Sequence, residues 1–133
     1  MQQFQRVLNV SGYQGPPIYL LSSAYVQNAV AMSKPISQAF QPNVFSHYER
    51  YIVYNANFMR HMEFTSGNGF VTLSIFAHEL GHHFYGHADA IINWGISIHP
   101  HDKECNADYY SGFVLAKLGA RPVDLESTQR LIF

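Results

Sequence analysis

The residues of this chain best suited to chemistry are two histidines four residues apart, with a glutamate directly after the first: His78, Glu79 and His82 in the sequence His-Glu-Leu-Gly-His. On an α-helix, residues i and i+4 lie one turn apart on the same face, with about 5 to 6 Å between their Cβ atoms. Both imidazoles can therefore reach one zinc ion at about 2.0 to 2.1 Å. Glu79 would then lie beside the ion, in position to take a proton from water rather than to bind the metal.

The sequence around the motif supports a helix. In a chain with 8 histidines and 5 glutamates, a chance match to HExxH has a probability of about 1 in 50, so the motif alone is not decisive. Apolar residues at positions 73, 76, 77, 80 and 84 follow the helical period on both sides of it. We therefore expect a helix from about residue 69 to 85 that ends near Gly86.

A catalytic zinc site needs a third protein ligand and one open position for water. The metzincin spacing would require glycine at position 85 and histidine at position 88, where this chain has Tyr85 and Ala88. Glu104 and Asp108 lie four residues apart on a second expected helix, so one carboxylate can bind zinc while the other holds a ligand imidazole. A solvated helix face explains this spacing equally well. The downstream candidates for the third ligand are His83, His87, His99, His101, Glu104 and Asp108.

The second expected helix runs from Glu104 to Leu118, with Asp102 as its N-cap and Gly119 at its end. The face that carries the two carboxylates continues through Ser111, Gly112 and Leu115. We expect this face to pack closely against Gly81 of the first helix.

The two motifs together resemble a known family. The stretch Phe76-Ala77-His78-Glu79-Leu80-Gly81-His82-His83, followed by Glu104-x-x-Ala107-Asp108-x-x-x-Gly112, is similar to gluzincin metallopeptidases related to HtpX and the CAAX prenyl endopeptidase. The resemblance covers roughly residues 50 to 126. It implies that His78, His82 and Glu104 bind Zn²⁺, that Glu79 is the general base, and that Asp108 supports the site from outside the coordination sphere.

The leading functional hypothesis is a zinc metalloendopeptidase that acts on a peptide or protein substrate. Weak candidates for the donor to the oxyanion are Tyr109, His99, His101 and Arg121. The alternative is a latent or non-proteolytic zinc-binding module, or a subunit of a larger assembly. It is motivated by the low charged fraction of 13% and by a first third without motifs. A deformylase ranks last, because that family takes a cysteine ligand from upstream of HExxH and Cys105 lies downstream.

Length and composition favour one domain, residues 1–133, with an N-terminal segment of unknown role at 1–44 and the metallopeptidase-like core at 50–126. A net charge of −1 gives no basic surface for nucleic acid. No apolar run is long enough to span a membrane and no signal peptide is recognisable. We therefore expect a soluble protein and favour the cytoplasm as its compartment. A homo-oligomer or a covering partner is compatible with the low charge.

The remaining elements complete an α+β, mainly helical fold: a zincin-like minidomain with two ligand-bearing helices and a small sheet. We expect a helix from Ser22 or Ser23 to just before Pro35 and a strand at 50–55, whose edge is a candidate for pairing with an extended substrate. A short helix at 58–64 capped by Asn57 and a last helix that begins at Pro122 complete the prediction.

Overall fold

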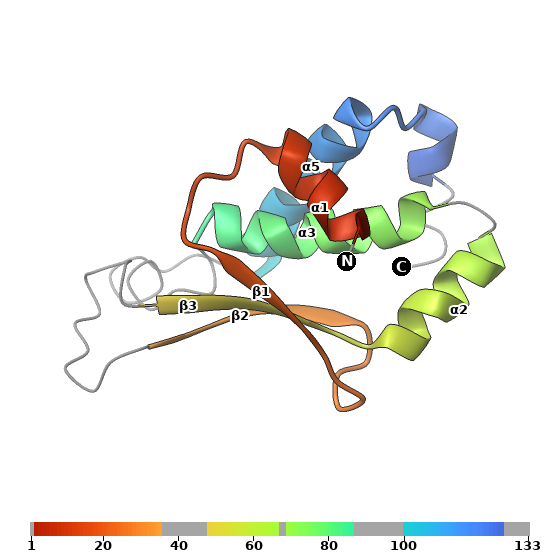
Figure 1. The fold of residues 1–133 in the computed structure, drawn as a ribbon. Helices are drawn as coiled ribbons and strands as arrows, with labels where there is room; N and C mark the ends of the chain where they lie inside the picture. The colour runs from red at the N-terminus through yellow and green to blue at the C-terminus, as the bar shows by residue number, and fades with distance from the viewer. Residues whose placement is uncertain (1, 36–47, 67–68, 87–99, 127–133) are drawn as a thin grey trace.

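A computed structural model describes residues 2–35, 48–66, 69–86 and 100–126 of the chain. The described part is a mixed α+β, mainly helical structure in which helices cover one face of a three-stranded sheet (Figure 1). This arrangement confirms the expected fold class at the coarse level. Its elements are α1 (Gln2–Ser11), β1 (Ile18–Ser22), β2 (Ala29–Pro35), β3 (Tyr48–Tyr54), α2 (Ala56–Ser66), α3 (Phe70–Phe84) and α5 (Pro100–Lys117).

The sheet has the strand order β1-β3-β2, with β1 parallel and β2 antiparallel to β3. The strand expected at 50–55 is confirmed as β3. The expectation that its edge pairs with substrate is wrong, because β3 is the central strand and both its edges are occupied. Among the described residues, β1 and β2 are the edge strands.

The helix expected between Ser22 and Pro35 is wrong, because this stretch contains the end of β1 and the whole of β2. Residues 29–34 alternate between half-buried and exposed side chains, which is the period of a strand with one face on the core. Alanine, valine and methionine at these positions are compatible with a helix locally. Pairing of β2 with β3 over its whole length overrides that local preference.

Helix α3 is the central element of the core and confirms the helix expected at 69–85. It lies between the sheet and α5, and α1, which the sequence pattern did not reveal, also packs against it. Phe76 is fully buried, and its ring lies 5.6 Å from that of Phe4 in α1 and 5.7 Å from that of Tyr54 in β3. The helix ends before Gly86, whose φ of 72° is the left-handed conformation expected of a helix end.

The boundaries of two other helices differ from expectation. Helix α5 begins at Pro100 rather than after Asp102, because proline fits the first turn of a helix, where no backbone N–H needs a partner. Helix α2 is capped by Asn55 rather than Asn57: the side-chain oxygen of Asn55 accepts the backbone N–H of Phe58 at 3.0 Å. Pro122 does begin a helical turn, which is described as far as residue 126.

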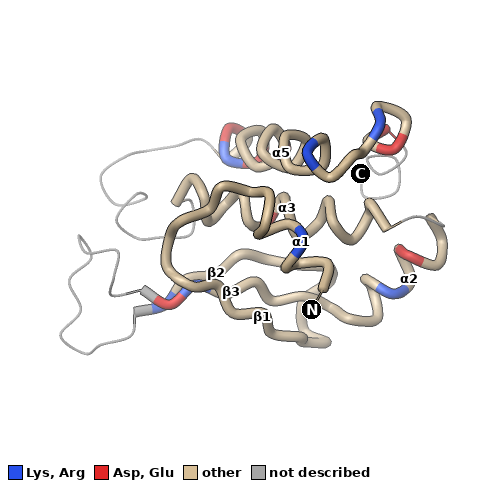
Figure 2. Tube along the Cα trace, turned by 45° about the horizontal axis from the view of Figure 1, so that its top comes forward, with Lys and Arg blue, Asp and Glu red and all other residues tan. Residues whose placement is uncertain are grey.

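Charged residues are sparse on the described surface, and Figure 2 shows acidic and basic residues interspersed rather than gathered into one basic face. The sheet face opposite α3 carries exposed apolar side chains, namely Tyr19, Leu21, Val30 and Met32. Of the helices that the structure describes, none has the length and hydrophobicity needed to cross a bilayer.

Candidate metal centre

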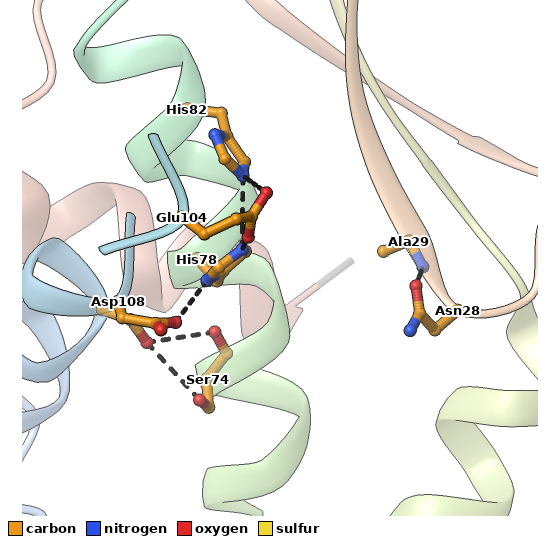
Figure 3. Close-up of polar contacts among 8 residues, drawn as sticks. Asn28, Ala29, Ser74, His78, His82, Glu104 and Asp108 are labelled. Atoms are coloured by element: carbon orange, nitrogen blue, oxygen red, sulfur yellow. Dashed lines mark hydrogen bonds and ion pairs between the residues drawn. The ribbon is translucent and has the colours of Figure 1, made fainter. Parts of the chain in front are cut away.

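The two histidines and the distant carboxylates meet where α3 passes α5 (Figure 3). His78 and His82 lie one turn apart on α3 and point their rings toward α5. Glu104 and Asp108, one turn apart on α5, point back toward α3. All four side chains, which the sequence analysis singled out, therefore come together although 26 residues separate His78 from Glu104.

The spacing of the three expected donor groups matches a tetrahedral ion. The Nε2 atoms of His78 and His82 are 3.2 Å apart. The carboxylate of Glu104 places one oxygen 2.9 Å from the His78 Nε2 and the other 3.4 Å from the His82 Nε2. Ligand atoms bound tetrahedrally at about 2.0 to 2.1 Å lie about 3.3 to 3.4 Å from one another. The donor groups are thus close to the separation that zinc requires.

The chemistry of these atoms also calls for a positive charge between them. Asp108 Oδ1 lies 2.8 Å from Nδ1 of His78, and an ionised carboxylate can only accept, so the proton of a neutral His78 ring sits on Nδ1. Its Nε2 then presents a lone pair to Glu104, which is also an acceptor. A proton on this nitrogen or a bound cation resolves this contact, and nitrogen and oxygen donors of this kind suit zinc. Asp108 fixes the tautomer and orientation of the ring.

Glu79 lies on the same helix, and its carboxylate and the two imidazoles have ligand atoms within 4.8 Å of one another. Proximity alone would allow Glu79 as the third ligand. Glu104 is the stronger candidate for that role, because its oxygens lie 2.9 and 3.4 Å from the imidazole nitrogens. Glu79 instead accepts a hydrogen bond from the backbone N–H of Ala31 in β2.

The environment of Glu79 shifts its titration to neutral pH. Burial raises the pKa of the carboxyl group from 4.5 to about 7, because the charged form loses its hydration. The electrostatic interaction with His78 and the hydrogen bond from the Ala31 backbone lower the pKa, while the nearby Glu104 carboxylate raises it. A carboxyl group that titrates near pH 7 is well suited to accept and return a proton.

Strand β2 forms the opposite wall of the site, which the sequence analysis missed because it assigned these residues to a helix. The cleft that β2 forms with α3 and α5 has a volume of about 480 Å³. The histidines and carboxylates described above all line this cleft. The other lining residues are Asn28, Ala29, Val30, Ala31, Ser74, Ile75, Pro100 and Lys103.

The pairing of β2 with β3 fixes which backbone groups face the cleft. The carbonyl of Asn28 accepts the N–H of Asn55 at 2.7 Å, so alternate residues of β2 from Asn28 onward direct their backbone groups toward β3. Ala29 and Ala31 therefore direct theirs outward, which agrees with the hydrogen bond from Ala31 to Glu79. In the sequence, small residues at 29, 31 and 33 alternate with larger ones at 30, 32 and 34, and this was the available signal for the strand.

The other candidate residues that the structure describes do not line the cleft. His83 is buried, with Nε2 2.8 Å from the carbonyl oxygen of Tyr51, so it ties α3 to the sheet. His101 lies on the exposed side of α5 beside Cys105. Of the proposed oxyanion donors, Tyr109 is exposed and Arg121 pairs with an aspartate; neither is among the described residues lining the cleft. His87 and His99 lie outside the described residues.

No family model, curated protein or solved structure matches this chain.

Proposed function

We propose that this protein is a zinc-dependent endopeptidase with a zincin-like, gluzincin-type site. The observation that carries the proposal is the set of separations of 2.9, 3.2 and 3.4 Å among the donor groups of His78, His82 and Glu104. These groups come from two helices far apart in the sequence. A general-base carboxyl and a strand edge lie directly beside them.

His78, His82 and Glu104 would hold the zinc ion. When bound, zinc supplies a Lewis acid that polarises a carbonyl group and lowers the pKa of water toward 7. Asp108 keeps Nε2 of His78 available as a ligand atom by accepting the proton of Nδ1.

Glu79 is the residue that moves the proton. Its carboxylate accepts a proton from the attacking water, and the resulting acid returns it to the leaving nitrogen of the cleaved peptide. The Ala31 N–H orients this carboxylate from the far wall of the cleft. One side chain therefore serves both halves of the hydrolysis.

The outer edge of β2 supports a peptide substrate. The outward carbonyl groups of Ala29 and Ala31 run along the cleft beside Glu79, while the N–H of Ala29 donates to the Asn28 side chain and that of Ala31 to Glu79. An extended peptide can add to such an edge through main-chain hydrogen bonds, which brings its carbonyl groups past the site. Small side chains at both positions leave room for this approach.

The exposure of the site favours catalysis over a purely structural zinc site. The Glu104 side chain is 59% exposed and borders the open cleft, so water and substrate have access to the donor groups. Structural zinc sites are usually closed by four protein ligands.

The test measures zinc content and the cleavage of an unstructured protein in the wild type and in Glu79→Gln. We expect about one zinc per chain in both proteins, cleavage abolished by a chelator, and a rate in Glu79→Gln that is about 10² to 10⁴-fold lower. Cleavage that persists without metal or without Glu79 contradicts the proposal. Stoichiometric zinc with no cleavage by the wild type identifies the non-proteolytic module instead.

A further inference from the structure

Gly81 lies between the two histidines on α3, at a point of close contact with α5. A Cβ atom at this position would lie 3.1 Å from the Cα of Ala107, 3.3 Å from the carbonyl oxygen of Ala107 and 3.2 Å from the Cβ of Tyr110. All three distances are shorter than an ordinary carbon contact of about 3.5 to 4.0 Å. Gly81 and Ala107 are both buried, so water does not separate the helices here.

This contact lies in the same seam as the candidate zinc ligands. One turn before Gly81, His78 contacts Asp108, and one residue after it, His82 faces Glu104. Farther along, the hydroxyl of Ser111 donates to the carbonyl of Ser74 at 3.2 Å. The spacing of the helices at Gly81 therefore determines how far the Glu104 carboxylate must reach.

A methyl group at Gly81 cannot be accommodated by rotating a side chain. The atoms that it would meet are the backbone of Ala107 and the first side-chain atom of Tyr110, whose positions are set by α5 itself. The helix as a whole must move away by a few tenths of an ångström. Metal–ligand distances in a well-formed site fall within about 0.2 Å of their ideal values, and a displacement of a few tenths of an ångström exceeds that range.

We propose that Gly81 is a positioning residue that holds α5 at the distance where Glu104 completes the zinc site with His78 and His82. This inference rests on the proposed function, because it assigns the helix spacing a role in metal binding. It predicts that Gly81→Ala weakens zinc binding about 10 to 100-fold, as does the loss of residues that orient metal ligands.

The experiment compares zinc affinity, measured by competition with a chromophoric chelator, and the absorption spectrum of the cobalt-substituted protein. Gly112→Ala is the matched control: it is also a helical glycine, but a Cβ there meets nothing within 4 Å. Val7→Ala, a cavity in the buried face of α1, controls for general loss of stability. We expect weakened zinc binding and an altered cobalt spectrum in Gly81→Ala alone.

Unchanged zinc affinity in a folded Gly81→Ala protein, or an equal loss in Val7→Ala, overturns the inference and leaves the proposed function intact. Wild-type protein that binds no zinc overturns both. Ala107→Ser adds one side-chain atom on the α5 side of the same helix contact. This variant takes the place of Gly81→Ala if the Gly81→Ala protein does not fold. Its zinc affinity must also fall if helix spacing sets the ligand geometry.

Discussion

Replacing Glu79 with glutamine should change how the stability of the metal-free protein depends on pH. Burial raises the pKa of Glu79 to about 7 in the folded protein, against 4.5 for the ordinary group. Because the folded-state pKa is the higher one, ionisation of Glu79 opposes folding. The contribution of Glu79 to stability is therefore most favourable below pH 4.5 and is lost as the pH rises toward 7. Glutamine carries no charge and removes this loss.

The magnitude follows from the size of the shift. Each unit of pKa difference corresponds to about 1.4 kcal/mol, so a rise from 4.5 to about 7 destabilises the wild type by roughly 3 kcal/mol at pH 7 to 8. In a domain of this length that energy corresponds to roughly 10 °C in the unfolding temperature. The difference between the variant and the wild type should thus widen in favour of the variant as the pH rises.

Urea unfolding in the presence of a chelator, at steps between pH 4.5 and 8, measures this difference. The exposed Glu126→Gln variant is the control for removing a carboxylate outside the cleft. Adding zinc should narrow the gap between Glu79→Gln and the wild type, since a nearby cation favours the ionised carboxylate. Unfolding free energies of the two proteins that stay parallel across the pH range would refute our account of the Glu79 environment.

Three further predictions concern the ligands and the strand. Asp108→Ala should keep its fold but bind zinc about 10 to 100-fold more weakly by chelator competition, because His78 loses its orienting partner. Chelation should lower the unfolding temperature of the wild type, since zinc at about 100 times its Kd adds about 2.7 kcal/mol, and Glu104→Ala should show little of this change in thermal melts. Val30→Pro should lower the melting temperature more than Ala31→Pro, because only Val30 directs its N–H toward β3. Ala31→Pro should chiefly slow cleavage, because it removes the N–H that bonds to Glu79. Equal melting temperatures of the two variants would contradict the assignment of the outer edge of β2.

The strand assignments show where local sequence patterns fall short. The β-branched and aromatic run at 50–55 identified β3 correctly, because a strand of that composition has few alternatives. Its place in the centre of the sheet was not readable, since the neighbours of a strand are determined by pairing with distant segments. Long-range pairing also explains why the segment before Pro35, which we expected to be a helix, is strand β2 and forms one wall of the cleft.

By itself, the sequence determined that His78 and His82 share one face of a helix with Glu79 beside them, because helical spacing is a local property of the backbone. It also offered Glu104 and Asp108 as a carboxylate pair, but not their position relative to the histidines. Only the tertiary structure decided that position. The close approach of α5 to Gly81 brings the carboxylates within 2.8 to 3.4 Å of the imidazoles, and contacts between separate helices depend on packing rather than on local periodicity.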